Sequence, residues 1–284
     1  MKGEGIMSRK MDFIPLICDY EWIRNQMYED LKYRLESRHS QTSLGRPLYY
    51  RINTQIIITQ ECPYHCPFCI ERKNPMEGKN DFEKQIVALK QVLSEHPAAR
   101  LTITGGEPGL YPHHVKNLVD TYFANGDKTF VSINTSGYST ELNGLAHINL
   151  SVNDYVKPDT KKFPVCTLQT VLKDGDMTLN NLRKIMMENP NVDAFSFRYL
   201  SFLEKHDYSV RVFNEMQWSD DFQVSTFRVG DFFVYVTFNW FYNGKKKHGR
   251  ITLGDMYQQQ HNDYQDGYSN IIIHPNGEVR INWK

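Results

Sequence analysis

The sequence lacks a long apolar run and an excess of charge of either sign. No stretch approaches the roughly 20 apolar residues that a membrane-spanning helix needs. Asp12 and Pro15 interrupt the short apolar segment near the start, so we expect no signal peptide either. Lysine plus arginine and aspartate plus glutamate number 33 each, which gives no reason to expect nucleic acid or another polyanion as a partner.

Cysteine is also scarce, with five residues in 284. Five cysteines do not make a disulfide framework, because Cys18 and Cys166 stand alone in the sequence. The other three are close together in a spacing typical of metal ligands, so we expect a reducing, cytoplasmic compartment. The length allows a sizeable core. The chain has no internal repeat, low-complexity tract or clear linker, so we expect one domain over residues 1–284.

Three regions of that domain differ in pattern. Residues 1–50 read as a helical prelude, because apolar side chains recur four apart on one face and Asp19 is placed to cap the start; these side chains are Ile23, Met27, Leu31 and Leu35. Residues 51–208 alternate short apolar strands with amphipathic segments, and residues 209–284 are rich in aromatic and β-branched residues around hairpin turns.

Alternation of strands and helices indicates parallel βαβ units. The predicted strands are 54–60, 100–104, 129–134, 147–153, 164–172 and 193–200. Helical apolar stripes fall between several of them, at Phe82, Ile86, Leu89 and Leu93, at Val115, Leu118 and Tyr122, and at Leu179, Leu182 and Met186. The fold class we predict is α/β: a partial (β/α)6 barrel with a C-terminal antiparallel β-hairpin extension.

Polar residues alternate with apolar ones along the later strands of this barrel. Side chains on a strand point alternately to its two faces, so the apolar set should meet the helices and the polar set should face the interior. A polar interior implies that a polar cofactor and substrate fill it. The polar set is Thr102, Thr104, Ser132, Asn134, Asn149, Ser151, Asn153, Thr167, Gln169, Ser196 and Arg198.

Cys62, Cys66 and Cys69 form a Cys-x3-Cys-x2-Cys loop directly after the first predicted strand. One interpretation is a structural zinc site with His65 or a distant residue as the fourth ligand. Zinc ribbons usually carry two Cys-x2-Cys pairs, however, and this chain has no second pair. A four-iron cubane normally takes four cysteines, so three would leave one iron open to a small molecule.

Gly105, Gly106, Glu107 and Pro108 follow the second predicted strand. Active sites of α/β barrels lie at the carboxyl ends of the strands, so this turn and the cysteine loop should share one end of the barrel. Glycines permit close backbone approach and positive φ, and Glu107 carries a charge. Taken alone, such a segment is an ordinary turn.

Together, the two motifs resemble those of radical S-adenosylmethionine (SAM) enzymes, including an aromatic residue, Phe68, just before the third cysteine. The resemblance implies a [4Fe–4S] cluster held by Cys62, Cys66 and Cys69. It further implies that SAM binds the fourth iron, and that the turn is the motif contacting the methionine part of SAM. The residues of that turn are Gly105, Gly106, Glu107 and Pro108.

Weaker resemblances add further candidates. Asn134 and Ser136 stand where the family often has a Thr-Asn-Gly-like turn near SAM, and Ser151 and Asn153 where it places contacts to the ribose. Arg198 resembles the strand-six arginine of the molybdenum-cofactor cyclase branch. The plain alternative for each is a polar strand-end residue bonded to a neighbouring loop.

The resemblance implies reductive cleavage of SAM to a 5′-deoxyadenosyl radical that abstracts hydrogen from a substrate, with a flavodoxin- or ferredoxin-type electron donor. The segment 272–281 resembles the strand-turn-strand before the auxiliary-cluster cysteines of peptide-tailoring members, yet no cysteine follows Cys166. We therefore expect no auxiliary cluster and a peptide or small biosynthetic molecule as substrate. No general acid or base is identified. The alternative function is a non-catalytic zinc or electron-transfer module.

Three other features have plain interpretations. His113 and His114 are expected as exposed first-turn residues of a helix. Cys166 should be buried packing. Lys245 to His248 follow Asn243-Gly244, a common hairpin turn, and should be a solvated turn.

Overall fold

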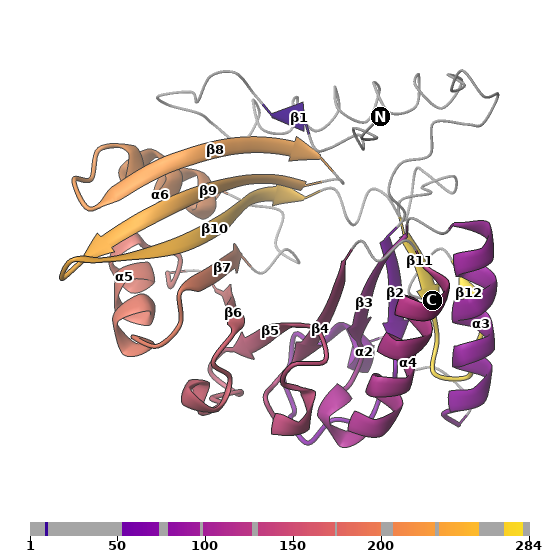
Figure 1. Ribbon diagram of the computed structural model, residues 1–284. Helices are drawn as coiled ribbons and strands as arrows, with labels where there is room; N and C mark the ends of the chain where they lie inside the picture. The colour runs from indigo at the N-terminus through magenta and orange to yellow at the C-terminus, as the bar shows by residue number, and fades with distance from the viewer. Residues whose placement is uncertain are drawn as a thin grey trace, which may run out of the picture. The chain divides into compact units, whose positions relative to one another are not determined.

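The structure is a computed structural model, and it describes residues 9–10, 53–73, 79–96, 99–126, 130–173, 175–199, 207–230, 233–255 and 270–280 (Figure 1). The chain divides into two compact units, each made of two segments. One comprises Arg51–Leu168 and Gln265–Lys284, and the other Met1–Tyr50 and Gln169–Tyr264. The helical prelude predicted for 1–50 lies outside the described residues, except for the two-residue strand β1 (Arg9–Lys10). That the chain is one domain stays a prediction.

The unit of Arg51–Leu168 and Gln265–Lys284 contains parallel strands joined by helices, as predicted. Strand β2 pairs with β3, β3 with β4, and β4 with β5, all in parallel. The elements in chain order are β2 (Asn53–Ile57), α2 (Ile70–Lys73), α3 (Phe82–Glu95), β3 (Arg100–Thr104), η1 (Pro108–Leu110), α4 (Pro112–Asn125), β4 (Val131–Thr135), η2 (Thr140–Leu142), β5 (His147–Val152) and η3 (Thr160–Lys162).

The C-terminal hairpin completes this unit in a way that the sequence did not predict. Strands β11 (Asn270–Ile273) and β12 (Val279–Arg280) pair antiparallel around the turn at Gly277, whose φ is 82°. Strand β11 also pairs in parallel with β2. The hairpin therefore extends the parallel sheet at its first strand.

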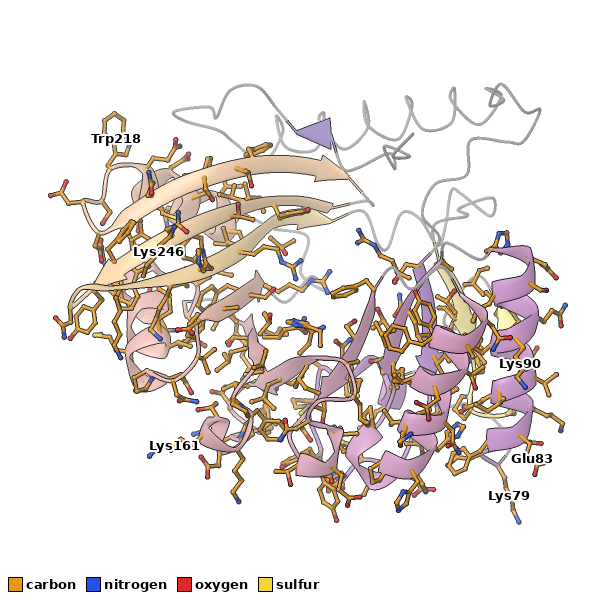
Figure 2. All side chains as sticks on the ribbon, in the orientation of Figure 1. Lys79, Glu83, Lys90, Lys161, Trp218 and Lys246 are labelled. Carbon is orange, nitrogen blue, oxygen red and sulfur yellow. The ribbon has the colours of Figure 1, made fainter. Side chains whose placement is uncertain are left out.

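Helices α3 and α4 lie side by side (Figure 1). The side chain of Asp81 caps α3 by accepting a 3.0 Å hydrogen bond from the N–H of Lys84, and Pro112 begins α4, where a missing N–H costs nothing. Leu89 and Leu118 are fully buried. Glu83 and Lys90 of α3 point outward (Figure 2), so the predicted helical stripes do mark the buried faces.

The predicted polar face of the parallel strands is present. Thr102 and Ser132 are 3.3 Å apart through their hydroxyl oxygens on neighbouring strands, and Asn149 Nδ2 donates to Asn134 Oδ1 at 2.8 Å. The apolar residues between them, such as Ile103, are fully buried. The strand period thus separates an apolar side from a hydrogen-bonded polar side.

Besides β1, the other unit contains the part of β6 (Cys166–Leu172) from Gln169 onward and six further elements. These are α5 (Leu179–Glu188), β7 (Ala194–Tyr199), α6 (Asp207–Gln217), β8 (Phe222–Gly230), β9 (Phe233–Tyr242) and β10 (Lys245–Asp255). Strands β8, β9 and β10 are antiparallel neighbours. Asn243 and Gly244 join β9 to β10 with positive φ of 48° and 72°, as the predicted two-residue turn requires. Strand β10 then pairs in parallel with β7, a pairing that the sequence did not reveal.

The prediction of a solvated turn at Lys245 to His248 is wrong for one residue. Lys246 is exposed on β10 (Figure 2), but Lys247 is only 4% exposed. Its ammonium group donates hydrogen bonds to the carbonyl oxygens that follow α5, at 3.3 Å to Asn189 and 3.1 Å to Pro190, and also to that of Val192. The strand alternation turns this side chain inward, and the carbonyls at a helix C-terminus satisfy its charge.

A second polar cluster joins α5 to β9 in this unit. The Asp221 carboxylate accepts hydrogen bonds from Arg183 Nε at 2.8 Å and Nη2 at 2.7 Å, from Ser219 Oγ at 2.6 Å and from Trp240 Nε1 at 2.7 Å. The Arg183 guanidinium, followed by the Ser219 and Trp240 hydrogen bonds, lowers the pKa of Asp221 well below its usual range even though burial opposes the shift.

The fold class is confirmed: a mixed α/β structure with a largely parallel sheet and an antiparallel C-terminal hairpin. Cys166 is buried at the start of β6, as predicted. Among the helices that the structure describes, none is long and apolar enough to cross a bilayer.

Candidate functional site

The cysteine loop leaves the carboxyl end of β2. Cys62, Cys66 and Cys69 are free thiols of intermediate exposure, and Cys69 N donates to Cys66 O at 3.1 Å in the turn before α2. Phe68 packs edge-on against Tyr155, with ring centroids 6.1 Å apart. The aromatic residue of the motif therefore ties the cysteine loop to the segment after β5.

The thiols perturb one another electrostatically. Burial raises the pKa of Cys62, a hydrogen bond from the Tyr64 backbone opposes this, and the charges of Glu107 and of the other two cysteines add to it. Burial also raises the pKa of Cys66, followed by the charge of Cys69. Deprotonation of these thiols is unfavourable without a bound cation. A metal ion would lower their pKa values, because its positive charge stabilises the thiolates.

Three cysteine thiolates are a donor set of the kind that holds an iron–sulfur cluster. In the described part of the chain no three His, Cys, Asp or Glu side chains are grouped to hold one metal ion. A structural zinc ion requires its ligands to converge at about 2.3 Å for sulfur. A cubane offers a separate iron to each cysteine, so three nearby thiols need not converge on one point. The residues present fit a cluster that takes one thiolate at each of three corners.

The turn after β3 is locked to the cysteine loop by backbone contacts. Gly106 N donates to Thr59 O at 2.6 Å, and Glu107 N donates to Glu61 O at 2.8 Å. A methyl group on Gly106 would lie 2.0 Å from Glu61 O, and Gly105 has a φ of 115°. Both positions therefore require glycine, the first for space and the second for its backbone conformation.

Glu107 points away from solvent and is fully buried. Its Oε1 accepts a 2.7 Å hydrogen bond from Gly109 N and a short one from Thr135 Oγ1, while Oε2 accepts from the backbone N–H of Ser136 at 2.7 Å and from the Ser136 hydroxyl. The carboxylate thus caps η1 and binds the carboxyl end of β4. Pro108, also buried, is the first residue of η1.

The other candidates from the same unit lie at neighbouring strand ends. Asn134 is half-buried on β4 and bonded to Asn149, and Ser151 is half-buried on β5. Asn153 follows β5, accepts hydrogen bonds from the N–H groups of its own turn, and hydrogen-bonds Cys66, which lowers the pKa of that thiol. Strands β2, β3, β4 and β5 therefore each contribute to one region around the cysteine loop.

Arg198 belongs to the other unit. It lies on β7, where its backbone position is paired with Thr252 of β10. That Arg198 and the other sequence-derived candidates contact a cofactor stays a prediction.

A buried network beside the site was missed by the sequence interpretation. Gln85 of α3 is fully buried, and its Nε2 donates to Ile57 O at 3.0 Å and His274 O at 3.1 Å. Its Oε1 lies 2.8 Å from His114 Nε2, which must carry the proton because an amide oxygen only accepts. The expectation for His114 is wrong: it is buried and stacked on Phe82, while His113 is exposed as predicted.

Two acidic residues of this region also went unpredicted. Glu71 of α2 is buried, which raises its pKa to about 7 although a hydrogen bond with Gln60 opposes the shift. Glu61 is exposed and accepts a 2.7 Å hydrogen bond from the Tyr111 hydroxyl. Glu71 is not part of an amphipathic helical pattern in the sequence, so nothing in the sequence indicated that it is buried.

Comparison with known proteins agrees with this geometry. Residues 56–157, which include the cysteine loop and all the candidates on β2 to β5, match the Radical SAM superfamily. This part of the chain is therefore similar to the radical SAM superfamily. The match implies a [4Fe–4S] cluster and SAM as cofactors.

Relatives of this chain include proteins named GTP 3′,8-cyclase. The sequence is 27% identical over 208 residues to the enzyme of Chlorobaculum tepidum, a match covering 66% of this chain and 59% of that protein. It is 23% identical over 258 residues to that of Haemophilus influenzae strain 86-028NP, covering 83% and 70%. The chain thus spans less than two thirds of the Chlorobaculum protein.

The fold is also similar to that of Streptococcus suis SuiB, crystallised with its precursor peptide SuiA. The TM-score is 0.52 at 14% identity, and the match covers 97% of this chain and 67% of SuiB. At this identity the similarity concerns the fold alone.

Proposed function

We propose that this protein is a radical SAM enzyme that abstracts hydrogen from an unidentified peptide or small biosynthetic molecule, with Cys62, Cys66 and Cys69 as the three cluster ligands. The observation that carries the proposal is the backbone lock between the cysteine loop and the turn at Gly105 to Pro108. It fixes the two motifs against each other. When bound, the cluster and SAM supply the reductive cleavage that gives methionine and a 5′-deoxyadenosyl radical.

The residues of the turn are suited to hold the methionine end of SAM. The N–H groups of Gly106 and Glu107 are used by the cysteine loop. The carbonyl oxygens of Gly105 and Gly106 accept no hydrogen bond from the residues that the structure describes. An ammonium group donates up to three hydrogen bonds, so these two carbonyls can bind the SAM amine while Glu107 keeps the turn in place.

The polar side chains on neighbouring strands would bind the nucleoside part. Asn134, Ser136, Ser151 and Asn153 lie at the carboxyl ends of β4 and β5, next to the cysteine loop. Phe68, which packs against Tyr155, would shield the cluster from water. In this proposal the protein orients the bond that breaks and keeps the site dry.

The substrate is a peptide or a small biosynthetic molecule. The named relatives suggest both, because one group is named for GTP and SuiB was crystallised with a peptide. A flavodoxin- or ferredoxin-type protein in the cytoplasm would supply the electron, since the cluster must work at the low end of a range that reaches about −700 mV.

Anaerobic reconstitution with iron and sulfide tests the proposal. We expect about four irons per chain, as in a cubane, brown absorbance, and 5′-deoxyadenosine after addition of dithionite and SAM. Cys66→Ala should lose the absorbance and the nucleoside. Cys166→Ala is the matched control, because this cysteine is buried in β6, and it should keep both.

The alternative is a zinc or electron-transfer module without SAM chemistry. Tight stoichiometric zinc with no nucleoside product from the wild-type protein would favour that module and reject the enzyme. If the protein bound a full cluster but did not cleave SAM, electron transfer would be the function that agrees with the data.

A further inference from the structure

A side chain of α3 holds the carboxyl end of β2, where the cysteine loop begins. The Nε2 atom of Gln85, which is fully buried, donates to Ile57 O at 3.0 Å and to Ile58 O at 3.3 Å. The same atom donates to His274 O, directly after β11, at 3.1 Å. Because Ile58 lies four residues before Cys62, one carboxamide fixes the strand end from which the loop departs.

His114 of α4 determines the orientation of this carboxamide. Its Nε2 lies 2.8 Å from Gln85 Oε1, and an amide oxygen only accepts hydrogen bonds, so the Nε2 proton points at Gln85. The amide nitrogen must then face the strand ends. Stacking of the imidazole on Phe82, with ring centroids 4.2 Å apart, fixes the plane of the ring. We call Gln85 and His114 the amide–imidazole pair.

Further contacts fix the segment between β2 and the first cysteine. Thr59 Oγ1 accepts hydrogen bonds from Asn80 Nδ2 and from the backbone N–H of Glu61, both at 3.0 Å. The Glu61 carboxylate accepts a 2.7 Å hydrogen bond from the Tyr111 hydroxyl. The Tyr111 ring packs edge-on against Phe82, with centroids 4.9 Å apart. The residues that lead into the cysteine loop are therefore tied to the starts of α3 and α4.

The hydrogen bonds of Gln85 explain why a polar residue occupies the buried side of α3. A buried carboxamide is unfavourable unless its donors and its acceptor are bonded, and an apolar residue would pack there without this requirement. Backbone carbonyl groups need a partner wherever a strand leaves its sheet. Gln85 supplies N–H donors at that point, so the chain can leave β2 and enter the cysteine loop with these carbonyl groups satisfied.

We infer that the amide–imidazole pair is a positioning element of the candidate site, which sets the path of residues 57–61 and thereby the place of Cys62. The carbonyl oxygens of Thr59 and Glu61 belong to this segment and bind the turn after β3, so the pair acts on both motifs. Both side chains act through the backbone of the loop, without contact to a cofactor. That the site holds a cluster and SAM rests on the proposed function, whereas the effect on the loop does not.

Hydrogen exchange of the full-length chain before reconstitution tests this inference without a cluster or SAM. The backbone N–H groups of Gly106 and Glu107 report on the segment, because their acceptors are Thr59 O and Glu61 O. Movement of residues 57–61 would break these two hydrogen bonds and expose both N–H groups to exchange with solvent.

Two variants disrupt the pair in different ways. Gln85→Met keeps the length of the side chain but not its polar groups, and His114→Phe keeps a ring to stack on Phe82 but not the proton donor. We expect exchange of the two reporter N–H groups to be about tenfold faster or more in Gln85→Met and about threefold faster in His114→Phe. Leu93→Ala is the control. Leu93 is 1% exposed near the end of the same helix, so this variant loses core packing and overall stability without changing the pair.

The reconstituted protein gives a second measurement, the electron paramagnetic resonance spectrum of the reduced cluster together with the SAM affinity. Gln85→Met should shift the spectrum and weaken SAM binding about fivefold or more, while Leu93→Ala should match the wild type in both. The double variant Gln85→Met/His114→Phe should be no worse than Gln85→Met, because His114 acts through Gln85.

Three results would overturn the inference: wild-type exchange of the reporter N–H groups in both variants, an equal increase in Leu93→Ala, or an unchanged spectrum and SAM affinity in Gln85→Met. If Gln85→Met does not fold, His114→Phe decides by the same comparisons. If the wild type assembles no cluster, hydrogen exchange alone decides. Because exchange needs no cofactor and 5′-deoxyadenosine formation is measured separately, failure of this inference and failure of the proposed function are distinguishable.

Discussion

The backbone N–H of Ser136 donates a 2.7 Å hydrogen bond to the carboxylate of Glu107. This bond joins the turn after β3 to the carboxyl end of β4. Because the backbone N–H of the same glutamate also donates to Glu61 O, Glu107 connects the ends of three neighbouring strands. Its carboxylate acts as an internal brace of the site.

Glu107→Ala should weaken SAM binding and leave the iron content near that of the wild-type protein. The change leaves the buried N–H of Ser136 and the N–H of Gly109 without their acceptor, at a cost of about 1–3 kcal/mol for such groups, so the turn should lose its shape. We expect a loss of about tenfold or more in SAM affinity, since 1.4 kcal/mol is tenfold. Equilibrium dialysis with SAM and iron analysis measure the two quantities. Glu141→Ala, on an exposed residue, is the control, and loss of iron from Glu107→Ala would mean that the residue is needed for folding.

Gly106→Ala should prevent normal assembly of the cysteine loop. The added methyl group would lie 2.0 Å from Glu61 O, a backbone atom that cannot move aside cheaply. We expect reconstituted iron to fall to less than half of the wild-type value. Gly144→Ala is the control, because its φ is 79° but nothing lies within 4 Å of the new methyl group, so it should cost only about 1 kcal/mol and keep its iron. Iron incorporation equal to the wild type in Gly106→Ala would refute the contact.

His114 should make the protein less stable in mild acid. Burial lowers its pKa from 6.5 to about 4, so the unfolded chain binds this proton at a higher pH than the folded chain does. The contribution is complete above about pH 6.5 and is lost as the pH falls towards 4, by up to roughly 3 kcal/mol. Urea unfolding between pH 4.5 and 7.5 measures the slope.

His114→Gln should flatten that slope, while His113→Gln, on the exposed neighbour, should not. Burial also lowers the pKa of His147, which adds to the slope in the same direction in all three proteins. The difference between the two variants is therefore the diagnostic quantity. Identical slopes would show that the His114 proton is not linked to folding.

Asp221 should stabilise the unit that contains β8 to β10, and its contribution should also fall with the pH, but in a more acidic range than that of His114. Its lowered pKa means that its contribution is complete above the unfolded value of about 3.8 and is lost as the pH falls below it. About a third of its side chain is exposed, so we expect Asp221→Asn to cost about 1–2 kcal/mol at neutral pH after allowance for solvent screening. Asp220→Asn, one residue away and exposed, should be neutral in the same chemical denaturation.

Much of the fold followed from the sequence because the strand and helix periods are clear. Predicted strands 100–104, 147–153 and 193–200 correspond to β3, β5 and β7 within one residue at each end. The parity argument correctly placed Asn134 and Asn149 on one polar face, where they are hydrogen-bonded. Local patterns sufficed for these features because each depends on residues near in sequence.

The features that escaped prediction depend on contacts distant in sequence. Nothing near β10 indicates that it will pair in parallel with β7, or that β11 will join β2. The sequence around Lys247 predicts an exposed side chain, but β10 places its ammonium group against the carbonyl oxygens that follow α5. Gln85 reads as a polar gap in an apolar stripe, yet it binds carbonyls of β2 and of the segment after β11.

The closeness of Gly106 to the carbonyl of Glu61 has a consequence for protein engineering. Neither segment leaves the other space to change its path. To graft this site onto another scaffold, residues 59–69 and 105–108 would have to be transferred together. Either segment alone would lack the backbone contacts that fix its conformation.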